Sequence, residues 1–243
     1  MLLQDKTAIV YGAAGPVGAA VAGAFAREGA RVVLAGRTQQ TLAKVADQIR
    51  DAGGAAQTAV VDVTDTAAMR AHAAEVAAAS GGIDIAFNAT SNDDLQGIPL
   101  LDMDLSDFAR PVSKAIAAHF TIATVIAPHM LGCGGVILAM AGGREAIPLL
   151  GGSHVAWSAL AGLCRQLAAE LGPHGIRVAW LLSPGSPGPG GATPGDGGPL
   201  AGPLIGRRPS YQEVANAAVF AASDWAATMT AAEVNLTGGI VID

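Results

Sequence analysis

The sequence predicts one α/β domain with a doubly wound, parallel sheet, and three observations support this prediction. First, short apolar runs alternate with alanine-rich stretches of helical periodicity along the 243 residues, which is the pattern of successive βαβ units. Second, the apolar runs end in Gly, Asn, Asp or Pro, so small and polar residues gather at the carboxyl edge of the sheet, where such sheets bind ligands. Third, a glycine-rich turn joins the first run to the first helical stretch.

The strand-like runs follow one another at regular intervals. Six of them lie at residues 7–12, 31–36, 56–63, 83–89, 134–142 and 176–185. After them the sequence predicts a helix over 209–223 and a last strand within 231–243. Because no shift in composition marks a second domain, we expect a single domain over residues 1–243.

Residues 183–206 differ from the rest of the chain, since 15 of these 24 residues are Gly or Pro. That composition excludes a helix or a central strand. Because the segment follows the end of a predicted strand, we expect either a loop that covers the substrate or a disordered insertion.

Gly12, Gly15 and Gly18 follow the first predicted strand and open the first predicted helix. Glycine at these places permits a tight turn and a close approach of the backbone to a phosphate, with Val17 at the same turn. Pro16 costs little there, because the first turn of a helix leaves its N–H groups unpaired. The strand, turn, helix and second strand together predict a Rossmann-type dinucleotide-binding unit, and simple turn glycines are the alternative.

The second predicted strand ends in Arg37 and Thr38, not in the Asp or Glu that would hold a ribose 2′-hydroxyl. An arginine at this position favours the 2′-phosphate of NADP. We therefore expect NADPH as the cofactor, with Arg37 and Thr38 near that phosphate. The alternative is an exposed arginine whose stem covers the edge of the sheet.

With these residues in view, the chain resembles the short-chain dehydrogenase/reductase family over essentially its whole length. "YGAAGPVG" resembles the family's Thr-Gly-x-x-x-Gly-x-Gly turn, and "VVDVTD", "IDIAFNATS", "LLSPGSPG" and "NLTGG" resemble further motifs of the family. The resemblance implies an oxidoreductase that acts on a small molecule and assembles as a homotetramer or homodimer. It also implies cofactor contacts at Asp62, Val63, Asn88, Ala89, Pro184 and Gly185.

The resemblance fails at the catalytic residues. Counting back from "AAELG" places Ser153 and Trp157 where the family has the Tyr and Lys of its Tyr-x-x-x-Lys motif. The family's active-site serine falls on Met140, and its helix-four asparagine falls near Ala115. No realignment restores the missing pair, because the only tyrosines and lysines of the chain are Tyr11, Tyr211, Lys6, Lys44 and Lys114.

Three residues remain as candidates for the chemistry. Ser153 is too weakly acidic to replace a phenol, and we expect it mainly as the N-cap of the following helix. His154, with an ordinary pKa of about 6.5, is either the proton donor or an exposed first-turn residue that points away from the cofactor. Trp157 either fills the volume left by the missing Lys and Tyr or attracts an iminium substrate through its ring face, with Glu145 as a counter-charge.

Composition bounds the partners and the location. With a net charge of −6 and no run of Lys or Arg, we expect a small neutral or cationic ligand, with no nucleic acid and no membrane as a partner. No uninterrupted apolar run reaches the roughly 18 residues that span a bilayer, so we expect a cytoplasmic protein. Cys133 and Cys164 share no metal-ligand spacing, so we expect buried thiols and no metal site. We expect His119 and His129 at the surface or in a subunit contact.

Three functions stay open on these grounds. The first is an NADP-dependent reductase with a rebuilt site, acting on an imine, on another activated group, or on a carbonyl with His154 as the acid. The second is a subunit or regulator that binds the nucleotide without chemistry. The third is a non-redox isomerase, lyase or cyclase that uses the same cleft.

Overall fold

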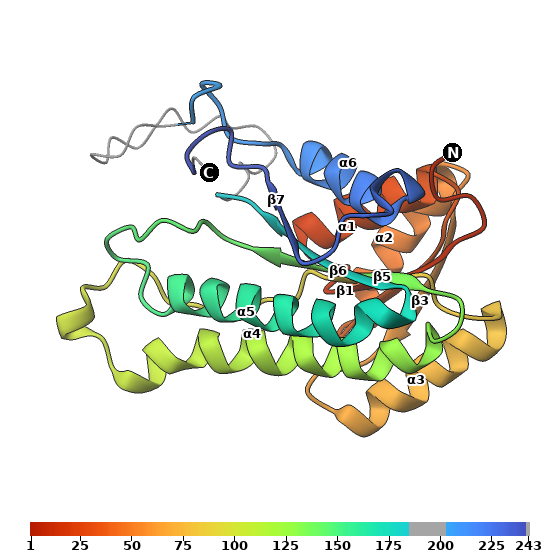
Figure 1. Ribbon diagram of the computed structural model, residues 1–243, viewed down its shortest axis with the longest axis horizontal. Coiled ribbons are helices and arrows are strands. Elements are labelled where there is room, and N and C mark those ends of the chain that lie inside the picture. Colours follow the sequence, from red (N-terminus) through yellow and green to blue (C-terminus); the bar gives the residue numbers. More distant parts are fainter. Residues whose placement is uncertain (185–202, 242–243) are drawn as a thin grey trace.

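A computed structural model describes residues 1–184 and 203–241, and it confirms the predicted class, a single α/β domain of the Rossmann type (Figure 1). Seven strands form one parallel sheet in the order β3-β2-β1-β4-β5-β6-β7. The strand order reverses between β1 and β4, the position at which such sheets bind ligands. The strands are β1 (Thr7–Tyr11), β2 (Arg31–Gly36), β3 (Ala55–Val60), β4 (Ile85–Asn88), β5 (Gly135–Ala141), β6 (Ile176–Leu182) and β7 (Ala232–Asn235).

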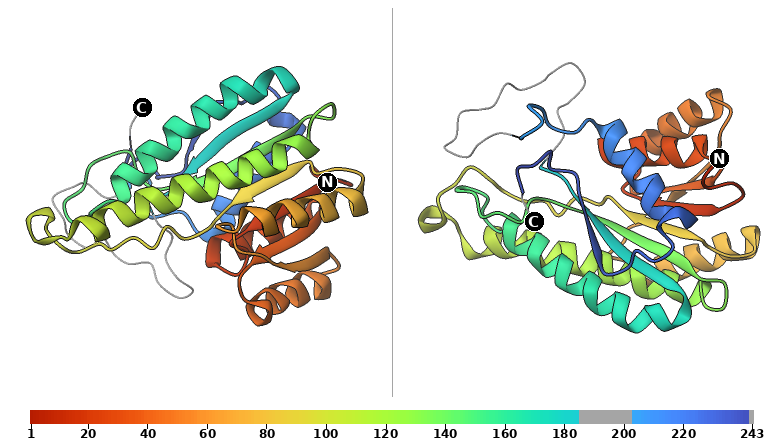
Figure 2. Two further views of the ribbon diagram at one scale, coloured as in Figure 1. Left: turned by 90° about the horizontal axis from the view of Figure 1, so that it is seen from below. Right: turned by 45° about the horizontal axis from the view of Figure 1, so that its top comes forward.

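Helices cover both faces of the sheet. In Figures 1 and 2, α1, α2 and α6 lie on one face, while α3, α4 and α5 lie on the other, with α4 and α5 side by side. No helix in the described part of the chain is long and apolar enough to cross a lipid bilayer. The helices are α1 (Pro16–Arg27), α2 (Gln39–Asp51), α3 (Thr66–Ser80), α4 (Leu105–Ile126), α5 (Ser153–Leu171) and α6 (Tyr211–Ala222).

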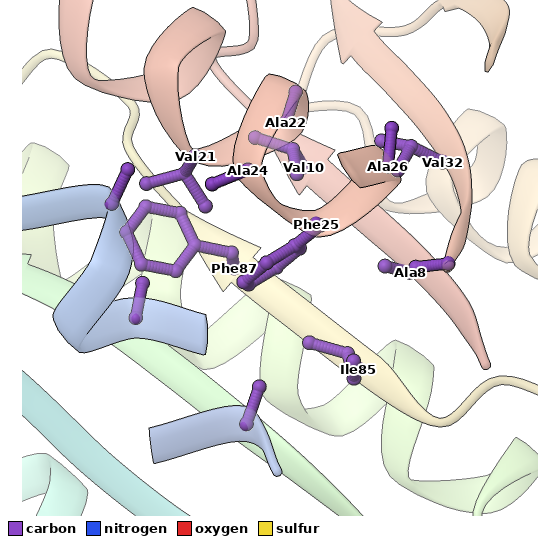
Figure 3. Close-up of a cluster of buried hydrophobic side chains, with 14 of the residues drawn as sticks. Ala8, Val10, Val21, Ala22, Ala24, Phe25, Ala26, Val32, Ile85 and Phe87 are labelled. Atoms are coloured by element: carbon purple, nitrogen blue, oxygen red, sulfur yellow. The ribbon is translucent and has the colours of Figure 1, made fainter. Parts of the chain in front are cut away.

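Two hydrophobic cores form because successive side chains of a strand point to opposite faces of the sheet. In β1, Val10 joins the core under α1 and α6, whereas Ile9 joins the core under α4 and α5. Phe25 of α1 meets Phe87 of β4 edge to face, with ring centroids 6.2 Å apart (Figure 3). The sheet is therefore buried on both sides, which holds the carboxyl ends of its strands in fixed positions.

The predicted strands agree with the observed ones to within a few residues. The sixth predicted run extends to residue 185, but β6 ends at Leu182. The third predicted run extends to residue 63, but β3 ends at Val60, so Asp62 and Val63 follow the strand. In the described part of the last run, residues 231–241, the only strand is the short β7. Of the glycine- and proline-rich segment, residues 185–202, including Gly185, lie outside the described residues.

Candidate active site

Two neighbouring clefts open at the carboxyl ends of the strands, and Thr90 lines both. The first, of about 300 Å³, lies between the glycine turn after β1 and the ends of β2, β3 and β4; we call it the glycine-turn cleft. The second, of about 570 Å³, lies between the ends of β4, β5 and β6 and the start of α5, and Trp157 forms part of its wall; we call it the tryptophan cleft.

The glycine turn is built by close backbone packing. Gly12 has a φ of +77°, and a Cβ there would overlap the carbonyl group of Ala89. A Cβ at Gly18 would overlap the carbonyl oxygen of Gly12. Pro16 is the first residue of α1 and Gly15 its N-cap, as predicted for a proline at a helix start. The turn therefore leaves the positive end of α1 open toward the cleft, which is a favourable place for a phosphate.

Charged side chains of both signs line the glycine-turn cleft. Asp62 accepts hydrogen bonds from the backbone N–H and the hydroxyl of Thr64, at 2.9 and 2.8 Å. These bonds, helped by the charges of Arg37 and Lys114, hold the pKa of Asp62 below its usual value. Lys114 of α4 forms an ion pair with Asp93. Lys114 lies far from the glycine motif in the sequence, and no local pattern marked it as a cleft residue.

The structure brings most of the predicted cofactor residues to the two clefts. Pro16 and Gly18 line neither cleft and instead shape the turn behind them. Val17, Asn88 and Pro184 line the tryptophan cleft. The residues that line the glycine-turn cleft are Gly12, Gly15, Arg37, Thr38, Asp62, Val63 and Ala89.

A buried line of polar groups lies beneath the tryptophan cleft. The side-chain oxygen of Asn88 accepts hydrogen bonds from the N–H and the hydroxyl of Thr90, so its Nδ2 faces Nδ1 of His119 at 3.5 Å. His119 Nδ1 is then the acceptor, and its Nε2 carries the hydrogen toward Sγ of Cys164, at 3.4 Å. Burial lowers the pKa of His119 to about 4 and raises the pKa of the Cys164 thiol to about 12, so both groups are neutral near pH 7.

This placement corrects two predictions. His119 was expected at the surface or in a subunit contact, but it is completely buried, because α4 presents it to β4 and α5 and not to solvent. Cys133 was expected as a buried thiol, but it is exposed in the turn that leads into β5. Cys164 is buried as predicted. His129 lies half-buried in the short turn after α4.

Ser153 does not cap α5, which corrects the prediction of an N-cap. With Ser153 as the N-cap, α5 would begin at residue 154. It begins instead at Ser153, with Gly152 as its N-cap and no side-chain capping bond. A Cβ at Gly152 would overlap the carbonyl oxygen of Phe108, so this close approach to α4 determines where α5 begins. Ser153 is completely buried, and its hydroxyl donates to Oδ2 of Asp94 at 2.6 Å.

Trp157 lies one turn further along α5, against the backbone after β5. A Cβ at Gly142 would overlap the Trp157 ring, so the ring packs directly on the glycine. Met140 and Ala115 line the same tryptophan cleft, at the places where the resemblance put the family's Ser and Asn. Both of these side chains are apolar.

His154 faces a different cavity. This cavity has a volume of about 210 Å³, and Trp157 forms a wall that it shares with the tryptophan cleft. Glu233 lies in it and accepts from Nε of Arg144 at 2.9 Å and from Nε1 of Trp180 at 3.0 Å. His154 does not line the tryptophan cleft, so the structure does not bring this candidate acid together with Asn88 and Pro184.

Comparison with known proteins supports the assignment to a family. The family model described as enoyl-(acyl carrier protein) reductase matches residues 12–241. The D-threitol dehydrogenase of Mycolicibacterium smegmatis is 33% identical over 249 residues, which cover 99% of this chain and 94% of that protein. The (+)-cis,cis-nepetalactol synthase NEPS3 of Nepeta racemosa is 31% identical over 254 residues, which cover 98% of this chain and 93% of that protein.

Solved structures agree with these sequence matches. A short-chain dehydrogenase from Burkholderia cenocepacia J2315, crystallised in complex with NADP, is similar with a TM-score of 0.86 and 26% identity, covering 99% of both chains. Fold, glycine turn and sequence likeness thus lead to the same class of protein. The chain belongs to the short-chain dehydrogenase/reductase family of oxidoreductases, within the group that the enoyl-(acyl carrier protein) reductase model describes.

Proposed function

We propose that the protein is an NADP-dependent reductase that transfers hydride to a small molecule bound in the tryptophan cleft. The observation that carries the proposal is the glycine-turn cleft: Gly12 and Gly18 permit the tight backbone turn that borders it, and Gly15, the N-cap of α1, lines it. The chain binds a nicotinamide nucleotide there, as the similar structure with NADP supports. When bound, this cofactor supplies the hydride.

Arg37 decides between the two nicotinamide nucleotides. It is an exposed residue directly after β2 and lines the glycine-turn cleft with Thr38. A guanidinium at this position attracts a 2′-phosphate, whereas the family members that prefer NAD need an acid there to hold a ribose hydroxyl. The protein therefore prefers NADPH to NADH.

The reacting centre differs from that of the family. Ser153 and Trp157 occupy the places of the family's Tyr and Lys, and the Ser153 hydroxyl already donates its hydrogen to Asp94. A carbonyl reduced by hydride needs a proton at oxygen, and the described residues that line this cleft include no phenol for that transfer. The substrate is accordingly an imine, an iminium ion or an activated carbonyl, for which the demand on a strong proton donor is smaller.

The cofactor preference is tested by Arg37→Ala. The variant should raise the KM for NADPH about tenfold or more, because one charge-assisted contact with the phosphate is lost, and should leave the KM for NADH nearly unchanged. The assay is the loss of NADPH or NADH absorbance with a panel of imines and ketones. Arg27→Ala, which removes an exposed arginine at the far end of α1, is the matched control. Equal weakening of both nucleotides by Arg37→Ala would overturn the preference.

A non-redox reaction in the same cleft is the second candidate. It is favoured by the likeness to a relative named as a nepetalactol synthase, and by a cleft whose described lining includes no Tyr or Lys. Product analysis distinguishes the two: product formed with no oxidation of NADPH supports the synthase, and stoichiometric oxidation supports the reductase.

A further inference from the structure

Asp94 is a carboxylate held in place at the tryptophan cleft. It belongs to the segment between β4 and α4 and lines the cleft together with Gln96. Its Oδ2 accepts from the Ser153 hydroxyl at 2.6 Å and from Nε2 of Gln96 at 2.7 Å. The same Gln96 nitrogen lies 3.1 Å from the Ser153 oxygen, which closes a triangle of three side chains. The buried hydroxyl on α5 thus anchors an otherwise exposed carboxylate at the cleft.

The direction of these hydrogen bonds limits the chemistry. Oδ2 of Asp94 accepts both of these hydrogen bonds, so Ser153 and Gln96 fix the orientation of the carboxyl group. The Ser153 hydrogen points to Asp94 and not to the cleft, so the serine is a positioning residue. A carboxylate held in this orientation can attract a positive charge.

The charged side chains that line the tryptophan cleft also favour a positively charged substrate. Among the described residues that line it, the charged side chains are Asp94, Glu145 and Arg208. Arg208 donates to the backbone oxygen of Pro184 at 3.3 Å. The two carboxylates outnumber the one guanidinium, and Trp157, a side chain of the type that attracts cations, lines the same cleft. A permanently charged iminium ion therefore fits the lining better than a neutral carbonyl.

We propose that Asp94, positioned by Ser153 and Gln96, selects a cationic iminium substrate, an inference that rests on the proposed reductase function. Hydride delivered to the iminium carbon forms the new C–H bond, and the π electrons of the C=N bond become the lone pair of the amine nitrogen. NADPH becomes NADP⁺, and no proton is required. Asp94 stabilises the positive charge of the bound substrate, which the cleft recognises before hydride arrives.

The experiment compares Asp94→Asn with the unaltered protein on two substrates of similar shape, an N-methylated cyclic iminium salt and the corresponding neutral cyclic ketone. The variant should lose kcat/KM for the iminium salt by about tenfold or more, because the amide keeps the size but loses the charge. Its kcat/KM for the ketone should change by less than about twofold. Equal losses on both substrates would overturn the proposal.

Two further variants sharpen the comparison. Asp102→Asn removes an exposed carboxylate outside the cleft and should leave both activities unchanged. Ser153→Ala frees the carboxylate of Asp94, so it should reduce the ratio of iminium to ketone kcat/KM, a readout that a simple loss of stability would not move. An unchanged ratio would show that Ser153 does not position Asp94.

A binding measurement separates this inference from the proposed function. A cyclic quaternary ammonium ion mimics the charge of the iminium salt. Calorimetry measures its affinity for the unaltered protein and for the Asp94→Asn variant, both with saturating NADP⁺. Tighter binding to the unaltered protein supports the role of Asp94 even if no substrate is reduced, in which case only the reductase function fails. Equal affinity for both proteins would reject the role of Asp94, whatever the outcome of the turnover assay.

Discussion

His119 shows how burial changes the chemistry of a single residue. The same side chain that would titrate near neutrality in water is held neutral between Asn88 and Cys164, and desolvation lowers its pKa to about 4. The sequence identified Asn88 and Cys164 as a strand-end residue and a buried thiol, yet it gave no sign that a histidine on a long helix would lie between them. The three side chains belong to three separate elements, β4, α4 and α5. They meet only because these elements pack together, and no local sequence pattern predicts that packing.

The stability of the protein should therefore fall as the pH is lowered from about 6.5 to about 4. Unfolded His119 binds a proton below about 6.5, whereas the folded side chain stays neutral until about 4, so the unfolded state binds more protons in this window. The expected loss is about 2 kcal/mol at pH 5 and about 3 kcal/mol at pH 4 from this residue alone.

Urea unfolding at pH 7 and pH 5 measures this loss. His119→Gln should reduce the pH dependence by that amount, and His174→Gln, which removes an exposed histidine after α5, should leave it unchanged. The same pH dependence in the His119 variant as in the unaltered protein would contradict a neutral buried histidine.

At the scale of elements, local patterns predicted the strands and the glycine turn well but failed at the start of α5. Strand runs and helix-capping residues act over a few neighbours, so their effects can be inferred from the sequence; Ser210 and Glu213, for example, form the capping box of α6. The start of α5 depends on Gly152 approaching the backbone of α4 more than forty residues away. With Gly152 as the N-cap, Ser153 is the first residue of α5, and its hydroxyl donates a hydrogen bond to Asp94.

Two glycines of α1 allow a matched test of the turn. Gly18→Ala should destabilise the protein by about 2 kcal/mol or more, because a Cβ there overlaps backbone atoms of Gly12 and Ala13 that cannot move without opening the turn. Gly23→Ala is on the same helix, and beyond the adjacent backbone of that helix no atom lies within 4 Å of its Cβ. It should stabilise the protein by about 0.5–1 kcal/mol through helix propensity.

Chemical denaturation of both variants, together with NADPH titration of Gly18→Ala, measures these effects. If Gly18→Ala proved as stable as Gly23→Ala and bound NADPH normally, the tight backbone contact at the turn would have no role.

At the scale of the whole molecule, one sheet joins the two hydrophobic cores, and both clefts lie at its carboxyl edge. A ligand at that edge contacts strands and helices from both sides of the point where strand order reverses. Folding and nucleotide binding should consequently be coupled over the entire domain.

NADPH should raise the unfolding temperature of the protein in a single transition. At a free concentration one hundred times its Kd, it should add about 2.7 kcal/mol to the free energy of unfolding, because it binds only the folded state. Differential scanning calorimetry measures this, with NADH at the same concentration giving a smaller shift. Two separate transitions, or no shift with either nucleotide, would contradict one domain with a nucleotide cleft.

The sequence by itself determined the class of fold and the glycine turn, because these depend on periodicity and on residue types at neighbouring positions. Only the tertiary structure decided which polar side chains meet in and beside the clefts. It buried His119 under Asn88, turned His154 toward a separate cavity, and tied Asp94 to Ser153 across fifty-nine residues of chain. These side chains come close to one another only when the helices pack against the sheet. The energies of their contacts depend on burial, which several segments of the chain produce together.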